Sequence, residues 1–130
     1  MKISTRGRYA LIIMINLALS KDILSLKDIA EKEELPLKYL EKIMALLVKA
    51  KLVKSIRGKD GGYQLIKNPK DYTVGEILRA SEGSLESRAC DTDTCEKHDT
   101  CPTIKFFDGL YKEINEYVDN KKLSDLIEEV

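Results

Sequence analysis

Residues 36–65, PLKYLEKIMALLVKAKLVKSIRGKDGGYQL, contain an amphipathic helix followed by two strands, and the architecture can be predicted from them. Pro36 suits the first turn of a helix, where its missing N–H is not needed. Apolar side chains then recur at helical spacing, with lysines on the opposite face. The apolar positions are Leu37, Leu40, Ile43, Met44, Leu47 and Val48. The pattern predicts a helix that is buried on one side and basic on the other.

A second helix is predicted just before this one. Ser25 followed three residues later by Asp28 resembles a capping box, in which side chains bind the free N–H groups at a helix start. A helix over residues 26–32 follows. Two short helices joined by a turn of about four residues indicate a helix-turn-helix motif. A helical hairpin with a solvated lysine face is the alternative at this point.

Two β-prone runs follow the second helix, Lys51–Arg57 and Tyr63–Ile66. The glycine-rich segment between them predicts a β-hairpin. A helix-turn-helix followed by a hairpin is the element order of a winged helix. Gly61 and Gly62 could be present only because the turn of the hairpin needs glycine. The cations beside them are not needed for the turn, but they can contact phosphates or a narrow minor groove. These cations are Lys54, Arg57 and Lys59.

The charge of the chain is divided, although its net charge is zero. Residues 1–72 carry 15 Lys and Arg against 8 Asp and Glu, whereas residues 73–130 carry 7 against 14. A basic first part indicates a polyanionic partner, and an acidic second part indicates a different task. We therefore expect a DNA-binding domain over residues 1–72, and a cysteine loop with a dimerisation helix over residues 73–130.

Size and composition exclude several classes of protein. A chain of 130 residues holds one modest core, which excludes a multidomain enzyme. The apolar run Tyr9–Leu19 predicts a buried helix that is too short to span a bilayer. Because basic residues precede it, this run also imitates a signal peptide. One histidine, no Ser/His/Asp spacing and no phosphate-binding loop leave no basis for an enzymatic mechanism.

The second part of the chain contains another capping box and an apolar seam. Thr73 and Glu76 predict a helix that ends near Gly83, and a polar loop follows it. Pro102 then begins a helix whose apolar residues recur at heptad spacing over about two heptads. They are Ile104, Phe107, Tyr111, Ile114 and Val118. The seam predicts a homodimer, with packing on the chain's own domain as the alternative.

All three cysteines lie within twelve consecutive positions, in CDTDTCEKHDTC at residues 90–101. They are Cys90, Cys95 and Cys101, and His98 lies between the last two. An odd number of grouped thiols favours a reducing compartment, where such thiols more often hold a metal than form disulfides. We therefore expect a cytoplasmic protein with a metal site in this loop.

Six motifs occur in a specific order: STRGRYA at 4–10, IA at 29–30, YLE at 39–41, LVKSIRG at 52–58, GGYQL at 61–65, and the cysteine loop. In this order they resemble the Rrf-two family of winged-helix transcription regulators, which includes the IscR, NsrR and CymR types. The first motif belongs to the family's first helix, which argues against a signal peptide. The resemblance implies a mainly α fold with a small β-hairpin, in which a winged helix-turn-helix domain carries a long dimerisation helix.

The resemblance also implies which residues contact double-stranded DNA at a palindromic operator. The expected contacts are Thr5, Arg6, Lys38, Tyr39, Glu41, Lys42 and Arg57, with Lys59 beside the wing. The two recognition-helix lysines are expected to hold phosphates. Glu41 either accepts a hydrogen bond from a cytosine amino group or pairs with one of these lysines. Relatives often have glycine where this chain has Glu33 and Glu34, which leaves the turn geometry open.

In cluster-binding relatives, three cysteines of this loop hold an iron–sulfur cluster, and the resemblance implies the same for Cys90, Cys95 and Cys101. A 2Fe-2S cluster is favoured over a 4Fe-4S cluster. Ile104 stands where the family's histidine would be, so the fourth ligand does not transfer, and His98 is the first candidate to replace it. A zinc ion on three thiolates and one imidazole is the alternative, and thiols that respond to oxidation without metal are another.

The function implied is a dimeric regulator, expected to repress, that senses iron–sulfur, redox or nitric oxide status through the cluster. The alternative is a CymR-like regulator that is controlled by a protein partner and whose cysteines are structural or bind zinc.

Overall fold

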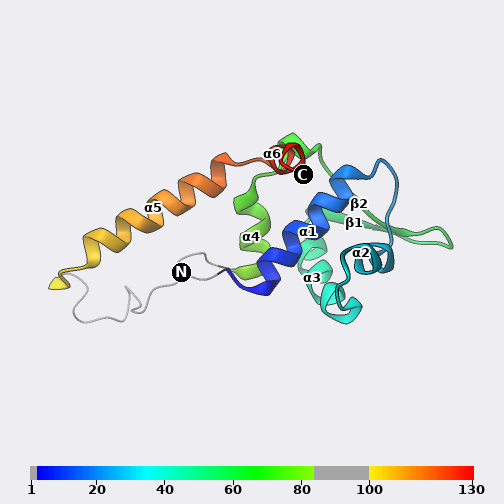
Figure 1. Ribbon diagram of the computed structural model, residues 1–130, viewed down its shortest axis with the longest axis horizontal. Helices are drawn as coiled ribbons and strands as arrows, with labels where there is room; N and C mark the ends of the chain where they lie inside the picture. The colour runs from blue at the N-terminus through cyan, green and yellow to red at the C-terminus, as the bar shows by residue number, and fades with distance from the viewer. Residues whose placement is uncertain (1–2, 84–99) are drawn as a thin grey trace.

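The computed structural model describes residues 3–83 and 100–130. Its elements are α1 (Thr5–Leu19), α2 (Leu26–Glu33), α3 (Leu37–Lys49), β1 (Val53–Ile56), β2 (Gly62–Leu65), a 3₁₀ helix η1 (Pro69–Asp71), α4 (Val74–Glu82), α5 (Ile104–Asn120) and α6 (Leu123–Glu128). Figure 1 shows the β1–β2 hairpin and α5 projecting at opposite ends, with α1 between them. The mainly helical fold with a small hairpin, predicted from the sequence, is confirmed.

The helix-turn-helix is formed by α2 and α3. The Ser25 hydroxyl accepts the Asp28 N–H at 3.1 Å, which is one half of the predicted capping box. Glu34 ends α2 in the left-handed conformation, with φ 55° and ψ 48°. A side chain in this conformation costs about 1–2 kcal/mol relative to a right-handed one. The turn therefore keeps the backbone geometry that glycine favours, although its residue is a glutamate.

The hairpin is antiparallel, with Val53 opposite Leu65 and Ile56 opposite Gly62. It is extended by a bridge to Leu24, whose N–H donates to the Tyr63 carbonyl at 3.1 Å and whose carbonyl accepts the Tyr63 N–H at 2.7 Å. A Cβ atom at position 62 would collide with the Leu24 carbonyl. Gly62 is thus required by this close approach, whereas the sequence suggested that it only closes the turn.

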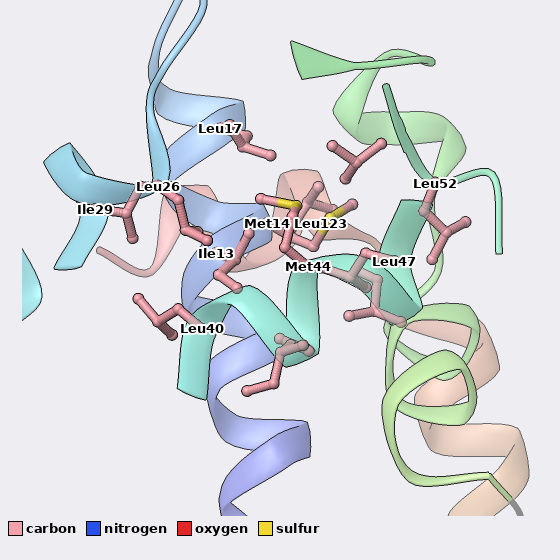
Figure 2. Close-up of a cluster of buried hydrophobic side chains, with 14 of the residues drawn as sticks. Ile13, Met14, Leu17, Leu26, Ile29, Leu40, Met44, Leu47, Leu52 and Leu123 are labelled. Atoms are coloured by element: carbon pink, nitrogen blue, oxygen red, sulfur yellow. The ribbon is translucent and has the colours of Figure 1, made fainter. Parts of the chain in front are cut away.

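The core lies between α1, α2, α3 and the helices of the second part of the chain (Figure 2). The apolar stripe of α3 is buried at its four central positions, as predicted, but Leu37 and Val48 near its two ends are exposed. Ile77 of α4 and Leu123 of α6 are fully buried in the same core as α1. The two parts of the chain, residues 1–72 and 73–130, therefore share one hydrophobic core. Their division into a DNA-binding part and a sensing and dimerisation part remains a prediction about function.

The predicted capping box at α4 is confirmed. The Thr73 hydroxyl accepts the Glu76 N–H at 3.1 Å, and the Glu76 carboxylate accepts the Thr73 N–H at 3.1 Å. Gly83 ends the helix with a φ of 83°, a conformation that favours glycine. In the part of the chain that the structure describes, no helix is both long enough and apolar enough to span a membrane.

The apolar seam predicted on α5 is divided in the structure. Val118 packs on Val74 and Leu78 of α4, and Tyr111 is also buried, whereas Phe107 is 40% exposed. The C-terminal part of the seam thus covers the chain's own domain, the alternative that the sequence left open. Other apolar side chains of α5 remain exposed, and we call them the α5 apolar face: Phe106, Phe107, Leu110 and Tyr117.

Candidate nucleic-acid interface

The second helix of the helix-turn-helix presents a polar face to solvent. Because Leu40, Met44 and Leu47 are buried in the core, the residues between them are turned outward. Lys38, Glu41, Lys42 and Lys49 are all exposed. An α-helix held on one side by a core and exposed along the other has the shape that enters a major groove.

Tyr39 differs from its neighbours because it contacts another helix. Its ring lies edge-on to the ring of Tyr9 in α1, with the centroids 5.4 Å apart and the planes at 83°. Aromatic pairs in this arrangement are stabilising. The contact joins the N-terminal half of α1 to the start of α3, so Thr5 and Arg6, both exposed one turn before Tyr9, belong to the same region of the surface.

The carboxylate of Glu41 on this basic face could form an ion pair with one of the two neighbouring lysines, and the structure tests this alternative. Over residues 3–83 and 100–130, no ion pair engages Glu41 or the two flanking lysines. The carboxylate is exposed. Of the two uses that the sequence left open, pairing with a lysine does not occur in this structure, and hydrogen bonding to a base amino group stays a prediction.

The hairpin presents Arg57 and Lys59 in its loop, and both are exposed. Its base is anchored by Tyr72, which is fully buried. The Tyr72 hydroxyl donates to the Leu52 carbonyl at 2.7 Å and accepts the N–H groups of Ile66 and Lys67 at 2.9 and 3.0 Å. Sequence reasoning missed this anchor, because a tyrosine after a hairpin carries no motif that distinguishes it from other aromatic residues.

Cys101 is the one predicted metal ligand within the described residues, since Cys90, Cys95 and His98 lie outside them. It precedes α5, and its Sγ lies 3.2 Å from the Thr103 hydroxyl. Hydrogen bonding by the Thr103 side chain lowers the pKa of the Cys101 thiol, and the Thr103 backbone adds to the effect. A lowered pKa favours the thiolate, which is the form that binds metal. Residues 3–83 and 100–130 alone contain no group of three or more candidate ligands.

The chain matches the Rrf2 family, described as "Iron-dependent Transcriptional regulator", over residues 3–129. Among curated proteins it is similar to the HTH-type transcriptional regulator IscR of Pectobacterium atrosepticum. The two are 33% identical over 130 residues, which cover 98% of this chain and 79% of the relative.

Two solved structures are similar over essentially the whole chain. CymR of B. subtilis, described as the global cysteine regulator, is 38% identical with a TM-score of 0.80, covering 100% of this chain and 98% of that one. IscR of T. potens is 37% identical with a TM-score of 0.80, covering 99% of this chain and 88% of that one. Relatives of both the IscR and the CymR type thus share this fold and its element order.

Proposed function

Because this chain belongs to the Rrf2 family of transcriptional regulators, we propose that it binds a palindromic operator as a homodimer and that its cysteine loop senses the signal. The family resemblance predicted from the sequence is confirmed. The family and its relatives are DNA-binding regulators and not enzymes, as the sequence also predicted. A protein that regulates transcription acts where the chromosome is, so we expect it in the cytoplasm.

The proposed operator contacts rest on the exposed, unpaired cations of α1, α3 and the wing. The ion pairs of the described residues join Lys67 to Glu76, Arg79 to Asp119, and Lys121 to Glu129. None of them uses a cation from the predicted DNA-binding set. Exposed lysines and arginines without an ion-pair partner can neutralise phosphates, and each neutralised phosphate releases a counterion. The winged helix supplies the geometry, with α3 for a major groove and the hairpin for the adjacent backbone or minor groove.

Homodimerisation is proposed through the α5 apolar face. Two of its residues, Phe106 and Tyr117, are 66% and 68% exposed. Figure 1 shows the N-terminal part of α5, which carries Phe106, extending beyond the rest of the molecule. Contiguous apolar residues on a projecting helix are typical of a protein interface. A second copy is the occupant that we propose, since a palindrome has twofold symmetry and calls for a twofold partner.

Removal of one phosphate contact should show in the salt dependence of operator binding. Because each copy of the proposed dimer loses one contact, we expect Lys38→Ala to weaken binding by roughly ten-fold and to reduce the slope of log affinity against log salt by about 1.8, or about 0.9 for each copy. The measurement is fluorescence anisotropy with a labelled operator at several salt concentrations. Arg57→Ala should behave similarly if the wing also contacts phosphate.

Lys70→Ala is the matched control, because it removes an equal charge from η1, which belongs neither to the helix-turn-helix nor to the hairpin. We expect it to leave the slope unchanged. Identical slopes for Lys38→Ala and Lys70→Ala would show that Lys38 does not contact the operator.

Sensing is proposed to depend on an iron–sulfur cluster held by Cys90, Cys95 and Cys101. The family description as iron-dependent supports a link to iron. Cys101 fits the role of a ligand because its lowered pKa favours the thiolate. When bound, the cluster would supply a centre that responds to oxidation, nitric oxide or iron–sulfur supply. A coupling of about 1–3 kcal/mol between cluster and operator would be enough to regulate transcription.

Anaerobically purified protein is expected to absorb visible light and to contain equal amounts of iron and sulfide. Cys101→Ala should abolish both, because it removes one thiolate ligand. Thr103→Val is the control, since it removes the hydroxyl beside the Cys101 Sγ but leaves all three thiols. Loss of the absorption band in His98→Ala as well would identify the fourth ligand. A colourless protein that contains zinc instead would contradict the cluster and support the zinc alternative.

A second candidate is favoured by the similarity to CymR, the global cysteine regulator of B. subtilis. In this alternative a protein partner controls operator binding, and the cysteines are structural or bind zinc. Regulation that survives Cys95→Ala, together with a partner that co-purifies with the regulator, would support it over cluster sensing.

A further inference from the structure

The first turn of α1 is capped by a residue from another helix. Glu82, at the end of α4, accepts the Ser4 and Gly7 N–H groups with one carboxylate oxygen, each at 2.9 Å, and the Ser4 hydroxyl donates to the same oxygen. The Ser4 side chain does not cap the helix itself. One free N–H in the first turn of α1, that of Gly7, and the N–H of the N-cap residue Ser4 are therefore bound by a residue that lies 75 to 78 positions further along the chain.

The local structure is built for this contact. A Cβ atom at Gly7 would lie 2.6 Å from the Glu82 carboxylate oxygen and 2.9 Å from the Ile3 side chain, so only glycine allows the approach. Gly7 is itself buried in the structure. A carboxylate at a helix N-terminus is further stabilised by the helix dipole. Glu82 thus fixes both the backbone of the first turn and the position of α4 against it.

The turn held by Glu82 carries two of the proposed DNA contacts. Thr5 and Arg6 are exposed there, and one turn later Tyr9 contacts Tyr39 of α3. We propose that Glu82 is a positioning residue for operator binding, which holds the first turn of α1 in register with the recognition helix. This inference rests on the proposed DNA contacts of α1 and extends them to a residue that touches no DNA.

The same helix is fixed to α5. Arg79, one turn before Glu82, donates to the Asp119 carboxylate at 2.5 and 3.2 Å and to the Asn115 side chain at 2.7 Å. A Cβ atom at Gly75 would collide with the Asp119 carboxylate, so this junction also needs a glycine. α4 therefore connects the proposed dimerisation helix to the DNA-contacting turn of α1, and a shift of α5 would reach that turn through Arg79 and Glu82.

The test compares three substitutions of Glu82 that separate reach from charge. Glu82→Gln keeps the length and an acceptor oxygen, whereas Glu82→Asp keeps the charge but is shorter by about 1.5 Å. Glu82→Ala keeps neither. We expect the alanine and aspartate variants to bind the operator roughly 2- to 30-fold more weakly, the factor that corresponds to loss of a helix cap, and glutamine to restore most of the affinity.

The direction in which Glu82→Ala changes operator affinity distinguishes a positioning role from a purely electrostatic one. Removing a negative charge alone should strengthen binding to a polyanion, so electrostatics without positioning predicts the opposite result for Glu82→Ala. Glu76→Gln is the charge control, since it removes one carboxylate charge from the other end of α4. We expect its affinity to equal or exceed that of the unmodified protein. Tighter binding by both Glu82→Ala and Glu76→Gln would overturn the proposal.

Hydrogen exchange of the Gly7 amide gives a readout that does not involve DNA. We expect its protection to fall in Glu82→Ala and Glu82→Asp by a factor similar to the loss of affinity, and to stay near the original value in Glu82→Gln. If Glu82→Ala does not fold, the aspartate variant carries the comparison, because it keeps the charge. Unchanged protection of Gly7 in both variants would overturn the cap.

Substitutions of Arg6 separate this proposal from the function on which it rests. If Arg6→Ala weakens operator binding but Glu82→Ala does not, the DNA contacts stand and the positioning role is wrong. If Arg6→Ala and Thr5→Ala leave affinity unchanged, the proposed DNA contacts of α1 fail, and the role of Glu82 fails with them. A smaller effect of Glu82→Ala when Arg6→Ala is already present would show that Glu82 acts through Arg6.

Discussion

Leu110→Glu is expected to convert the protein into a monomer that binds its operator at least a hundred-fold more weakly. Leu110 is 37% exposed and lies one helical turn from Phe106 and Phe107, within the α5 apolar face. In a symmetric dimer a glutamate there would be buried on both copies without a partner, and burying unpaired charges is costly. A monomer also loses the gain of roughly 10²- to 10⁴-fold that comes from occupying two linked half-sites.

Sedimentation velocity and operator titration together check this result. The matched control is Leu19→Glu, which makes the same change at an apolar residue that is 45% exposed and lies at the end of α1, outside the α5 apolar face. We expect Leu19→Glu to remain dimeric and to bind the operator normally. If Leu110→Glu sediments as a dimer with unchanged affinity, the proposed interface is wrong, and the α5 apolar face must serve another contact.

Tyr72→Phe is expected to lower the free energy of unfolding by about 2–4 kcal/mol, a large loss for a single oxygen atom. The phenylalanine ring fills the same space, so the effect isolates the hydroxyl. Without it, the Ile66 and Lys67 N–H groups and the Leu52 carbonyl lose a shared partner. The bond to the Leu52 carbonyl is buried, and the bonds from the two N–H groups are partly buried. Leaving such groups unsatisfied costs more than a hydrogen bond contributes, and here three groups depend on one hydroxyl.

Urea unfolding followed by circular dichroism measures the change. Tyr63→Phe is the control, because Tyr63 lies in the same hairpin and no hydrogen bond engages its hydroxyl within residues 3–83 and 100–130. We expect this control to shift the free energy of unfolding by less than about 0.5 kcal/mol. Since Tyr72 holds the base of the hairpin, Tyr72→Phe should also weaken operator binding through the wing. Equal urea midpoints for the two variants would mean that water replaces the lost hydroxyl.

The elements of the winged helix could be predicted because their signals are local. The stripe of Leu40, Met44 and Leu47 predicted the buried face of α3, and the Thr73 and Glu76 pair predicted the start of α4. Each signal involves residues within one or two turns of each other. Spacing of this kind depends only on helix or strand geometry, which does not vary with the rest of the chain.

Other features could not be predicted, because they depend on which segments meet. The requirement for glycine at position 62 follows from the Leu24 carbonyl, and that at position 7 from Glu82. The Tyr72 anchor likewise unites groups from the start and the end of the hairpin. A glycine or a buried tyrosine looks the same in sequence whatever approaches it, so these roles become visible only in the folded chain.

The cysteine loop shows how far each source of information extends. The family and the three candidate thiolates follow from residues 90–101 and their order relative to the other motifs. The structure adds the surroundings of Cys101, where the Thr103 hydroxyl lowers the pKa of the thiol. The fourth ligand does not follow from spacing, because a ligand can come from any segment that the fold brings near the loop.

The amino-acid sequence alone was sufficient for the winged helix, the family and the list of exposed cations, because these depend on periodicity and motif order. Tertiary packing decided which apolar residues of α5 are buried and which are exposed. It buried Val118 against α4 and left Phe106 and Leu110 exposed. The physical reason is that burial depends on which surface is adjacent, and α4 reaches only part of α5. The same packing made Glu82, 75 residues from Gly7, part of the first turn of α1.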